Sequence, residues 1–179
     1  DAFGNKVRVA LLHGKWKQNP NNPTRRDGTI HEYSPPLQVQ SEMERLVSMH
    51  YSHINQSVSP SVEAARLHHR FTQIHPFQDG NGRVARSLAS LIFIKAGWFP
   101  LVINRDFRDE YINALEAADN GDLSNLITLF AKLQKKAFVK ALSLDENVLN
   151  DNEPLKKVIS AGIERLKSRK EQQEMLMQR

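Results

Sequence analysis

The sequence predicts an all-α domain with one short β-hairpin near its N-terminus. From residue 39 onward, apolar residues recur at three- and four-residue spacing, which is the period of an amphipathic helix. The alternation typical of a strand occurs once, at residues 29–33. The 179 residues fit one domain with a real core, and 40% hydrophobic with 25% charged residues is ordinary for a soluble globular protein.

Residues 1–36 are irregular and contain a turn-dense run from Asn19 to Gly28. Asp27-Gly28 is a hairpin-turn signal, and the alternating segment follows it directly. Pro35 and Pro36 then end the segment. We therefore expect a hairpin over about residues 24–36.

Two helices are predicted next. The first runs from about Val39 to Ile54. Ser59 has the character of an N-cap, and Pro60 suits the first helical position, so the second helix should run from Pro60 to about Ile74.

A third helix is predicted from Gly82 to Ala96, with Gly97 ending it. Beyond Ser87 its residues are apolar on nearly all sides, so we expect a central, wholly buried element.

The remaining chain predicts three further segments. A helix with Asp106 as its N-cap should run to Ala118, and an amphipathic helix should follow from Leu123 to Leu142. Residues 144–153 are a polar linker. A highly charged final helix is expected from Pro154 to about Met177.

Composition indicates possible ligands and a compartment, but it does not identify a function. The formal charge of +5 suits a phosphate-bearing ligand, but it suits nucleic acid equally well. The absence of cysteine fits a reducing compartment such as the cytoplasm. No stretch approaches the ~18–20 apolar residues of a membrane span, and no signal-peptide pattern opens the chain. The chain starts at Asp1 without Met, which leaves open that it is a piece of a longer protein.

The most informative segment runs from His75 to Arg86. A glycine-rich turn that opens a helix is an anion site, because free N–H groups and the positive end of the helix dipole point the same way. Arg83 and Arg86 lie three apart and share one helix face. His75 and Asp79 just precede the helix, where they can supply a base and a metal ligand. This pattern indicates phosphate chemistry.

The segment also resembles a known signature. It is similar to the His-Pro-Phe-x-(Asp/Glu)-Gly-Asn-Gly-Arg-x-x-Arg motif of the Fic (filamentation induced by cAMP) domain family at every specified position. The likeness extends from about residue 20 to 140, because the family places a β-hairpin flap before the motif and a Tyr-x-x-Ala-Leu segment after it, here Tyr111 to Leu115. It implies a Fic-type catalytic domain at 1–143, with 144–179 as linker and appended helix.

The resemblance also implies a reaction. Fic enzymes typically move AMP from ATP to a Ser, Thr or Tyr hydroxyl of a target protein. His75 would be the general base, since imidazole suits that task at neutral pH. Asp79 would hold Mg²⁺, or Mn²⁺, because one carboxylate with phosphate oxygens is a common magnesium environment.

Other site residues follow from the same likeness. The main chain of Gly80, Asn81 and Gly82 would approach the phosphates closely. Arg83 would contact the leaving phosphates, and Arg86 the γ-phosphate. Tyr111 and Asn104 are candidates for the nucleoside side. In the flap, Thr29, Ile30 and His31 would order an extended target segment by strand addition.

Alternatives remain open at this point. Gly82 is retained where the phosphorylating branch of the family departs, which favours adenylylation, but transfer of UMP, GMP or phosphocholine is compatible with the same motif. A non-catalytic basic module that binds protein or nucleic acid through His68-His69-Arg70 and the C-terminal lysines is the rival from another class. The intact catalytic set makes nucleic acid the less favoured partner.

Many Fic proteins are held inactive by a helix with the pattern (Ser/Thr)-x-x-x-Glu-(Gly/Asn). Ser160 to Glu164 has the spacing but is followed by arginine, and Ser59 to Glu63 is followed by alanine. We therefore expect any inhibitory helix to come from upstream sequence or from a partner chain, and a homo-oligomer is compatible with the latter.

Overall fold

The computed structural model describes residues 11–12, 14–25, 28–143 and 157–168. After an irregular N-terminal segment come η1 (Pro36–Gln38), α1 (Val39–Asn55), α2 (Pro60–Ile74), α3 (Asn81–Lys95), η2 (Arg105–Phe107), α4 (Arg108–Asp119) and α5 (Ser124–Leu142). Residues 157–168 are also helical. This confirms the all-α prediction.

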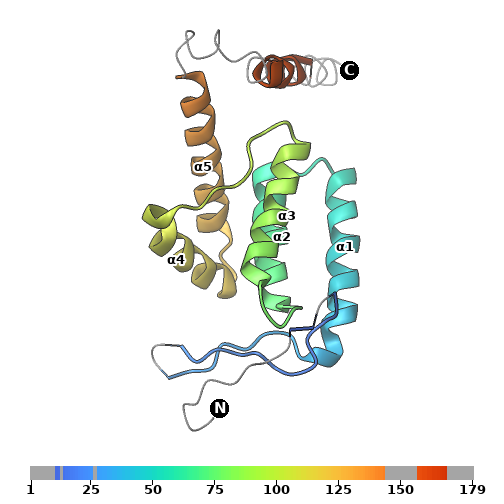
Figure 1. Ribbon diagram of the computed structural model, residues 1–179. Coiled ribbons are helices and arrows are strands. Elements are labelled where there is room, and N and C mark those ends of the chain that lie inside the picture. The colour runs from blue at the N-terminus through green and yellow to red at the C-terminus, as the bar shows by residue number, and fades with distance from the viewer. Residues whose placement is uncertain (1–10, 13, 26–27, 144–156, 169–179) are drawn as a thin grey trace.

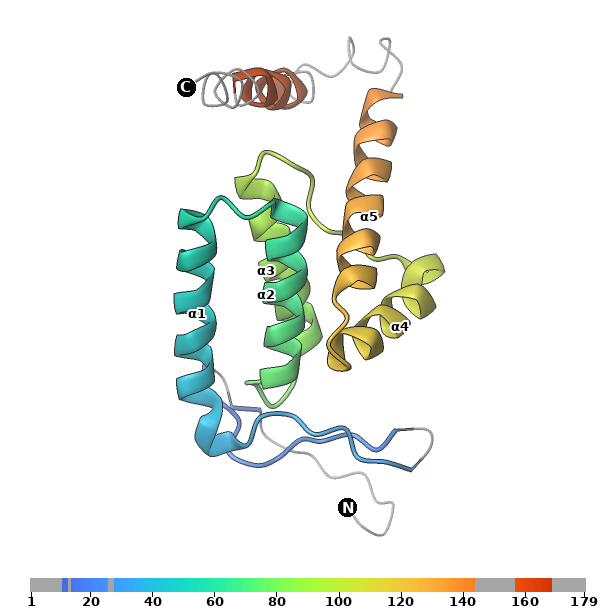
Figure 2. The same ribbon diagram turned by 180° about the vertical axis from the view of Figure 1, so that it is seen from behind.

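Helix α2 is the centre of the domain. It packs against α1, α3, α4 and α5. Figures 1 and 2 show α2 and α3 as an antiparallel pair, with α1 on one side and α4 and α5 on the other. The largest fully buried side chains include Phe71 of α2, Phe93 of α3 and Phe130 of α5, and the rings of Phe93 and Phe130 are 6.3 Å apart. The core therefore lies between α2 and its neighbours.

The expectation of a wholly buried α3 is wrong. Leu91 is 46% exposed and Ile94 is 52% exposed. The packing of α3 is chiefly against α2, so a single stripe of the helix is covered, and its buried residues are Asn81, Ala85, Ala89, Ile92 and Phe93. The apolar character of a sequence does not say how many neighbours a helix will have, and here the central position belongs to α2.

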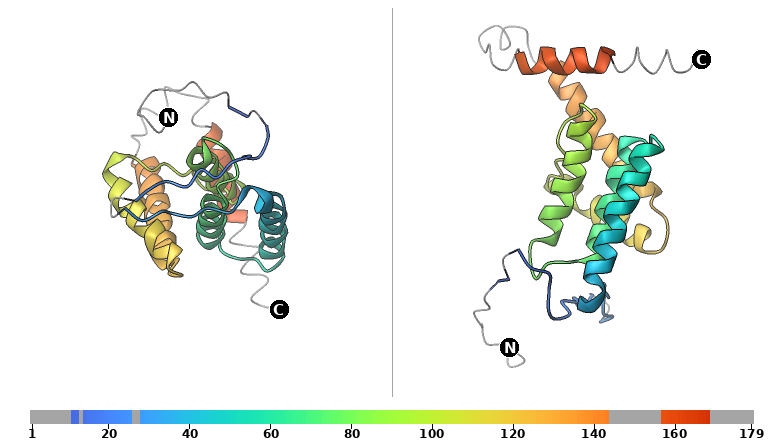
Figure 3. Two further views of the ribbon diagram at one scale, coloured as in Figure 1. Left: turned by 90° about the horizontal axis from the view of Figure 1, so that it is seen from below. Right: turned by 90° about the vertical axis from the view of Figure 1, so that its right-hand side faces the viewer.

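The predicted β-hairpin at the flap, residues 24–36, is not confirmed, because the described residues of the flap form no strand. One antiparallel bridge joins Thr24 and Ile30, with the His31 N–H donating to the Pro23 carbonyl at 2.9 Å. The ladder stops there because Pro23 has no N–H and because the Tyr33 N–H donates to the Asn22 side chain, at 3.1 Å, in place of a main-chain carbonyl. Seen from below, the two arms of the flap cross beneath the α2–α3 loop toward α4 (Figure 3).

Helix ends agree with the sequence reading in part. Ser59 is the N-cap of α2 and Pro60 is the first helical residue, although the Ser59 side chain makes no capping hydrogen bond. The prediction that Asp106 caps the next helix is wrong, because residues 105–107 form a 3₁₀ turn and α4 begins at Arg108. The predicted linker at 144–153 and the far end of the final helix lie outside the described residues. In the described part of the chain, no helix is long and apolar enough to cross a membrane.

Candidate active site

The motif loop, residues 75–80, connects the C-terminus of α2 to the N-terminus of α3. His75 is the C-cap of α2 and has φ of 50°, in the left-handed region, while Gly80 is the N-cap of α3 with φ of 81°. A non-glycine residue held there costs on the order of 1–3 kcal/mol, which the surrounding structure must offset. The left-handed turn at His75 ends the helix and redirects the chain into the loop.

Asn81 holds this loop in shape. Its side-chain oxygen accepts a hydrogen bond from the Phe77 N–H at 2.8 Å, and its amide donates to the Phe77 carbonyl at 2.7 Å. The residue is 1% exposed. The side chain of Asn81 is therefore committed to the loop, and the main-chain N–H, the group predicted to approach the phosphates, is what Asn81 can offer to an anion.

The N-terminal segment supports the same loop from the other side. Lys17 donates its main-chain N–H to the Pro76 carbonyl at 2.7 Å and its ammonium to the Ile74 carbonyl at 3.3 Å. The Asn21 amide donates to the Phe77 carbonyl at 3.0 Å. Burial lowers the pKa of Lys17 below its ordinary value. No motif in the sequence pointed to Lys17 or Asn21.

The imidazole of His75 is fixed by two contacts. Its Nδ1 lies 3.2 Å from the Thr72 carbonyl, and because a carbonyl only accepts, Nδ1 carries the proton. The Tyr33 ring stacks on the imidazole with centroids 3.7 Å apart and planes at 9°. Burial lowers the pKa of His75 to about 4, and the charges of Lys17 and His31 add to that effect. At neutral pH the ring is therefore uncharged, with Nε2 unprotonated.

The first turn of α3 supplies an anion cradle. A helix that begins at Asn81 leaves its first N–H groups without intrahelical acceptors. A Cβ at Gly80 would lie 3.2 Å from Nη2 of Arg83, and one at Gly82 would lie 3.3 Å from Nη1 of Arg86. The two glycines thus make room for the two guanidinium groups as well as for a ligand.

Asp79 is accessible beside this cradle. Its side chain is 63% exposed and accepts a hydrogen bond from Arg83 at 3.3 Å. Asp79, Gly80 and Arg83 line a cavity of about 390 Å³ whose other side is formed by Leu11, Leu12 and Gly14. The described residues contain no cluster of three or more His, Cys, Asp or Glu that could hold a metal by themselves. A lone carboxylate fits an ion that takes its other ligands from phosphate oxygens and water, as Mg²⁺ does.

The flap closes a second side of the motif. A cavity of about 310 Å³ lies between the flap and α4, lined by His31, Tyr33, Thr72 and Asp119 among others. Nδ1 of His31 lies 2.6 Å from Nη2 of Arg25 and 3.8 Å from Oδ2 of Asp119. The side chain of Ile30 is exposed. Tyr33 is the flap residue in direct contact with His75. The alternating pattern of residues 29–33 contained Tyr33 but did not mark it as part of the site.

Tyr111 lies beside Arg86. Its hydroxyl is close to the Arg86 side chain and lies 3.0 Å from Nε2 of His68. Burial raises the pKa of Tyr111. Asn104, the other nucleoside candidate, is exposed at the start of η2, where its carbonyl accepts from Phe107.

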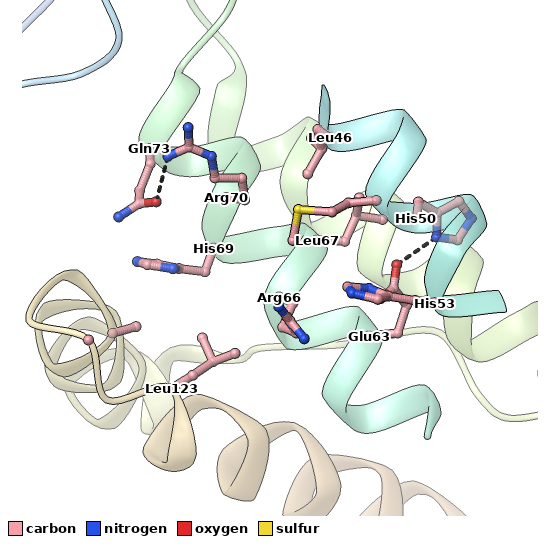
Figure 4. Close-up of a pocket in the computed structure, with 13 residues that line it drawn as sticks. Leu46, His50, His53, Glu63, Arg66, Leu67, His69, Arg70, Gln73 and Leu123 are labelled. Atoms are coloured by element: carbon pink, nitrogen blue, oxygen red, sulfur yellow. Dashed lines mark hydrogen bonds and ion pairs between the residues drawn. The ribbon is translucent and has the colours of Figure 1, made fainter. Parts of the chain in front are cut away.

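A second histidine cluster lies between α1 and α2, toward the other end of α2 (Figure 4). The buried carboxylate of Glu63 accepts a hydrogen bond from Nδ1 of His50 at 2.6 Å and another from Nδ1 of His53. Glu63 is therefore bonded to these histidines and not to Arg86. Among the described residues, no ion pair joins Glu164 to Arg86 either.

The site therefore combines a loop held by hydrogen bonds, a neutral imidazole and a helix N-terminus with free N–H groups within an all-α domain. A model of the Fic/DOC family matches residues 3–93, about half of the chain. The chain belongs to the Fic/DOC family.

Known proteins resemble it over part of its length. A protein adenylyltransferase, fic-1 of Caenorhabditis briggsae, is 34% identical over 102 residues, which are 55% of this chain and 20% of that protein. The structure of Fic-1 from C. elegans superposes with a TM-score of 0.56 at 30% identity, covering 61% of this chain and 33% of the other. A Fic-domain signaling protein from Bacteroides thetaiotaomicron gives a TM-score of 0.70 at 25% identity, covering 72% and 54%. The chain spans about a fifth of the length of the curated relatives.

Proposed function

We propose that this chain is the catalytic core of a protein adenylyltransferase, which transfers AMP from ATP to a Ser, Thr or Tyr hydroxyl of a target protein. The observation that carries the proposal is the state of His75, whose Nδ1–H is held by the Thr72 carbonyl so that Nε2 is free to accept a proton beside the anion cradle of α3. The relatives that are named protein adenylyltransferases support the same reaction.

His75 would act as the general base. Its Nε2 takes the proton of the target hydroxyl while that oxygen attacks the α-phosphorus and the bond to the β-phosphate breaks, releasing pyrophosphate. A pKa of about 4 ensures that the ring is uncharged before the reaction. A bound polyphosphate favours the imidazolium that forms next, because nearby negative charge stabilises a cation.

The start of α3 would hold the phosphates. The main-chain N–H groups of Asn81 and Gly82 and the guanidinium groups of Arg83 and Arg86 provide donors on one side of the loop. Asp79 would hold Mg²⁺ or Mn²⁺, which when bound neutralises charge on the departing pyrophosphate. Arg83, now bonded to Asp79, would exchange that contact for a phosphate.

The flap side would hold the nucleoside and the target. The cavity between the flap and α4 adjoins His75 through Tyr33 and Thr72, which is where the rest of a nucleotide would extend from the cradle. The exposed Ile30 and its neighbours Thr29 and His31 would pair with an extended target segment. An inhibitory helix, if the protein uses one, would be supplied from upstream or by a partner chain.

A label-transfer assay tests the reaction. The chain is incubated with Mg²⁺ and either α-labelled or γ-labelled ATP, alone and with a cell lysate, and protein-bound label is measured. AMP transfer attaches label only from the α position, and His75→Ala removes it. Label from the γ position would show phosphorylation instead, and competition by UTP, GTP or a phosphocholine donor would redirect the substrate assignment.

A further inference from the structure

His68 is a buried histidine that the proposed chemistry does not use. It lies on α2 and is 0% exposed. Its ring meets those of Tyr111 and Phe130 edge to face, with centroids 5.6 Å and 5.4 Å away. Its Nε2 lies 3.0 Å from the Tyr111 hydroxyl, and its Nδ1 has no hydrogen-bond partner among the described atoms.

The direction of the hydrogen bonds follows from what each group can donate. Arg86 has no acceptor, so the only hydrogen bond it can make with the neighbouring Tyr111 oxygen is one that it donates. The single hydroxyl proton of Tyr111 is then available for Nε2 of His68. Burial lowers the pKa of His68 to about 3, and the charges of Arg86 and His69 add to that effect, so the ring is neutral. A neutral ring that accepts at Nε2 carries its proton on Nδ1.

We propose that His68 is a positioning residue for Arg86, acting through the Tyr111 hydroxyl. The inference rests on the proposed function in one respect, namely that Arg86 grips the γ-phosphate of ATP. A guanidinium on a long side chain loses rotamer entropy when fixed, so an arginine already held in place binds a phosphate with less loss. The Tyr111 hydroxyl, fixed by its hydrogen bond with His68, would provide that hold.

The chemical nature of the partners supports this role. A carboxylate would hold Arg86 more tightly, but it would also neutralise the guanidinium and compete with a phosphate for it. The described residues place no carboxylate on Arg86. Tyr111 and the neutral His68 fix the position of the guanidinium while leaving its charge and its remaining N–H groups for a ligand.

The unpartnered Nδ1 of His68 supports the same role. An unpartnered polar atom in the interior is unfavourable, and a leucine would fill the same space against Phe130 without leaving Nδ1 unpaired. What a leucine could not do is accept the Tyr111 proton. The imidazole therefore serves the hydrogen bond and not the packing.

The test compares three variants of the full chain. His68→Leu removes the acceptor, His68→Gln retains one at the place of Nε2, and Tyr111→Phe removes the hydroxyl while keeping the ring. Calorimetric binding of ATP and of AMP is measured for each, with Tm as a folding control. We expect His68→Leu and Tyr111→Phe to weaken ATP binding about tenfold, the loss of one hydrogen bond, with AMP binding unchanged. We expect His68→Gln to stay near the wild-type value. A fourth variant that combines His68→Leu with Tyr111→Phe should bind ATP no more weakly than Tyr111→Phe alone.

Several results would overturn the inference. ATP and AMP binding that weaken together, or a His68→Gln variant as weak as His68→Leu, would show a structural role. Should His68→Leu fail to fold, His68→Gln with Tyr111→Phe still decides the matter through the ratio of ATP to AMP affinity. A wild-type chain that prefers ATP over AMP, with Arg86→Ala removing the preference, but that transfers no AMP would refute the proposed function and leave this inference standing. A preference that survives Arg86→Ala would refute the inference alone.

Discussion

Histidines form hydrogen bonds near both ends of α2, yet the two sets of imidazoles differ in what surrounds them. Toward the N-terminal end, His50 and His53 of α1 donate to the buried carboxylate of Glu63 and so tie two helices together (Figure 4). At the C-terminal end, His75 donates to a main-chain carbonyl, and the loop that follows it leads into the N-terminus of α3 with Arg83 and Arg86.

The difference shows that the density of histidines does not mark the reactive site. At Glu63 the carboxylate already accepts hydrogen bonds from its partners across the helix interface, so the cluster serves stability. At His75 burial lowers the pKa and so leaves the ring neutral, and Asp79 is the one acidic side chain of the motif loop. The comparison predicts that changes at one end should alter catalysis and changes at the other should alter folding.

The largest effect is expected from His75→Ala. Loss of a general base lowers the rate about 10²–10⁴-fold, whereas ATP binding stays close to the wild-type value because the phosphate donors remain. Rates of label transfer and calorimetric ATP binding check this. The matched variant His53→Ala should retain the rate per folded molecule, and equal losses in the two variants would erase the proposed distinction.

Asp79→Ala should reduce both activity and the metal-dependent part of ATP affinity. In the proposed function this carboxylate holds the metal ion, and its removal also releases Arg83. ATP titrations with Mg²⁺ and with EDTA measure the effect. A wild-type chain whose ATP affinity and activity are the same in EDTA would rule out a metal at Asp79.

Glu63→Ala should destabilise the fold without touching the chemistry. The change leaves two histidines without their acceptor at the α1–α2 interface, which costs about 1–3 kcal/mol in the free energy of unfolding. Urea unfolding gives that energy, and ATP binding at a temperature where the variant is folded gives the control. A variant with wild-type stability but impaired ATP binding would reverse the assignment of the two ends.

The smallest effect at neutral pH is expected from His68→Gln, which should change how the free energy of unfolding depends on pH in acid. The pKa of His68 is about 3 and that of His75 about 4 in the folded protein, both below the ordinary value of 6.5. Below pH 6.5 the unfolded chain therefore binds protons that the folded chain does not, so stability falls as the pH drops toward these values. His68→Gln should make that fall shallower between pH 6.5 and 4 in a series of urea unfolding curves. Identical slopes in wild type and variant would mean that His68 does not titrate as described.

The pH at which kcat/KM falls in acid reports the pKa of His75. In the free chain, the base is lost only as the pH approaches about 4. A limb in kcat/KM near 6.5 would show that the imidazole is exposed in solution and that Tyr33 does not cover it.

Much of the fold was open to prediction because it depends on local pattern. Apolar spacing located α1, α2 and α5 within a few residues, and Ser59-Pro60 marked the start of α2. The motif from His75 to Arg86 could be found for the same reason: its residues are consecutive, and a turn followed by a helix start is a local structure.

What the tertiary structure alone decided depends on contacts between distant segments. The sequence by itself determined the helices, the motif loop and the family resemblance. It could not show that Asn81 would turn its side chain to Phe77, that Tyr33 would stack on His75, or that α2 and not α3 would be central. It also gave no sign that His68 and Tyr111, 43 positions apart, would meet at Arg86. These features arise because burial and hydrogen-bond partners are set by which helices pack together, and no periodicity along one segment records that choice.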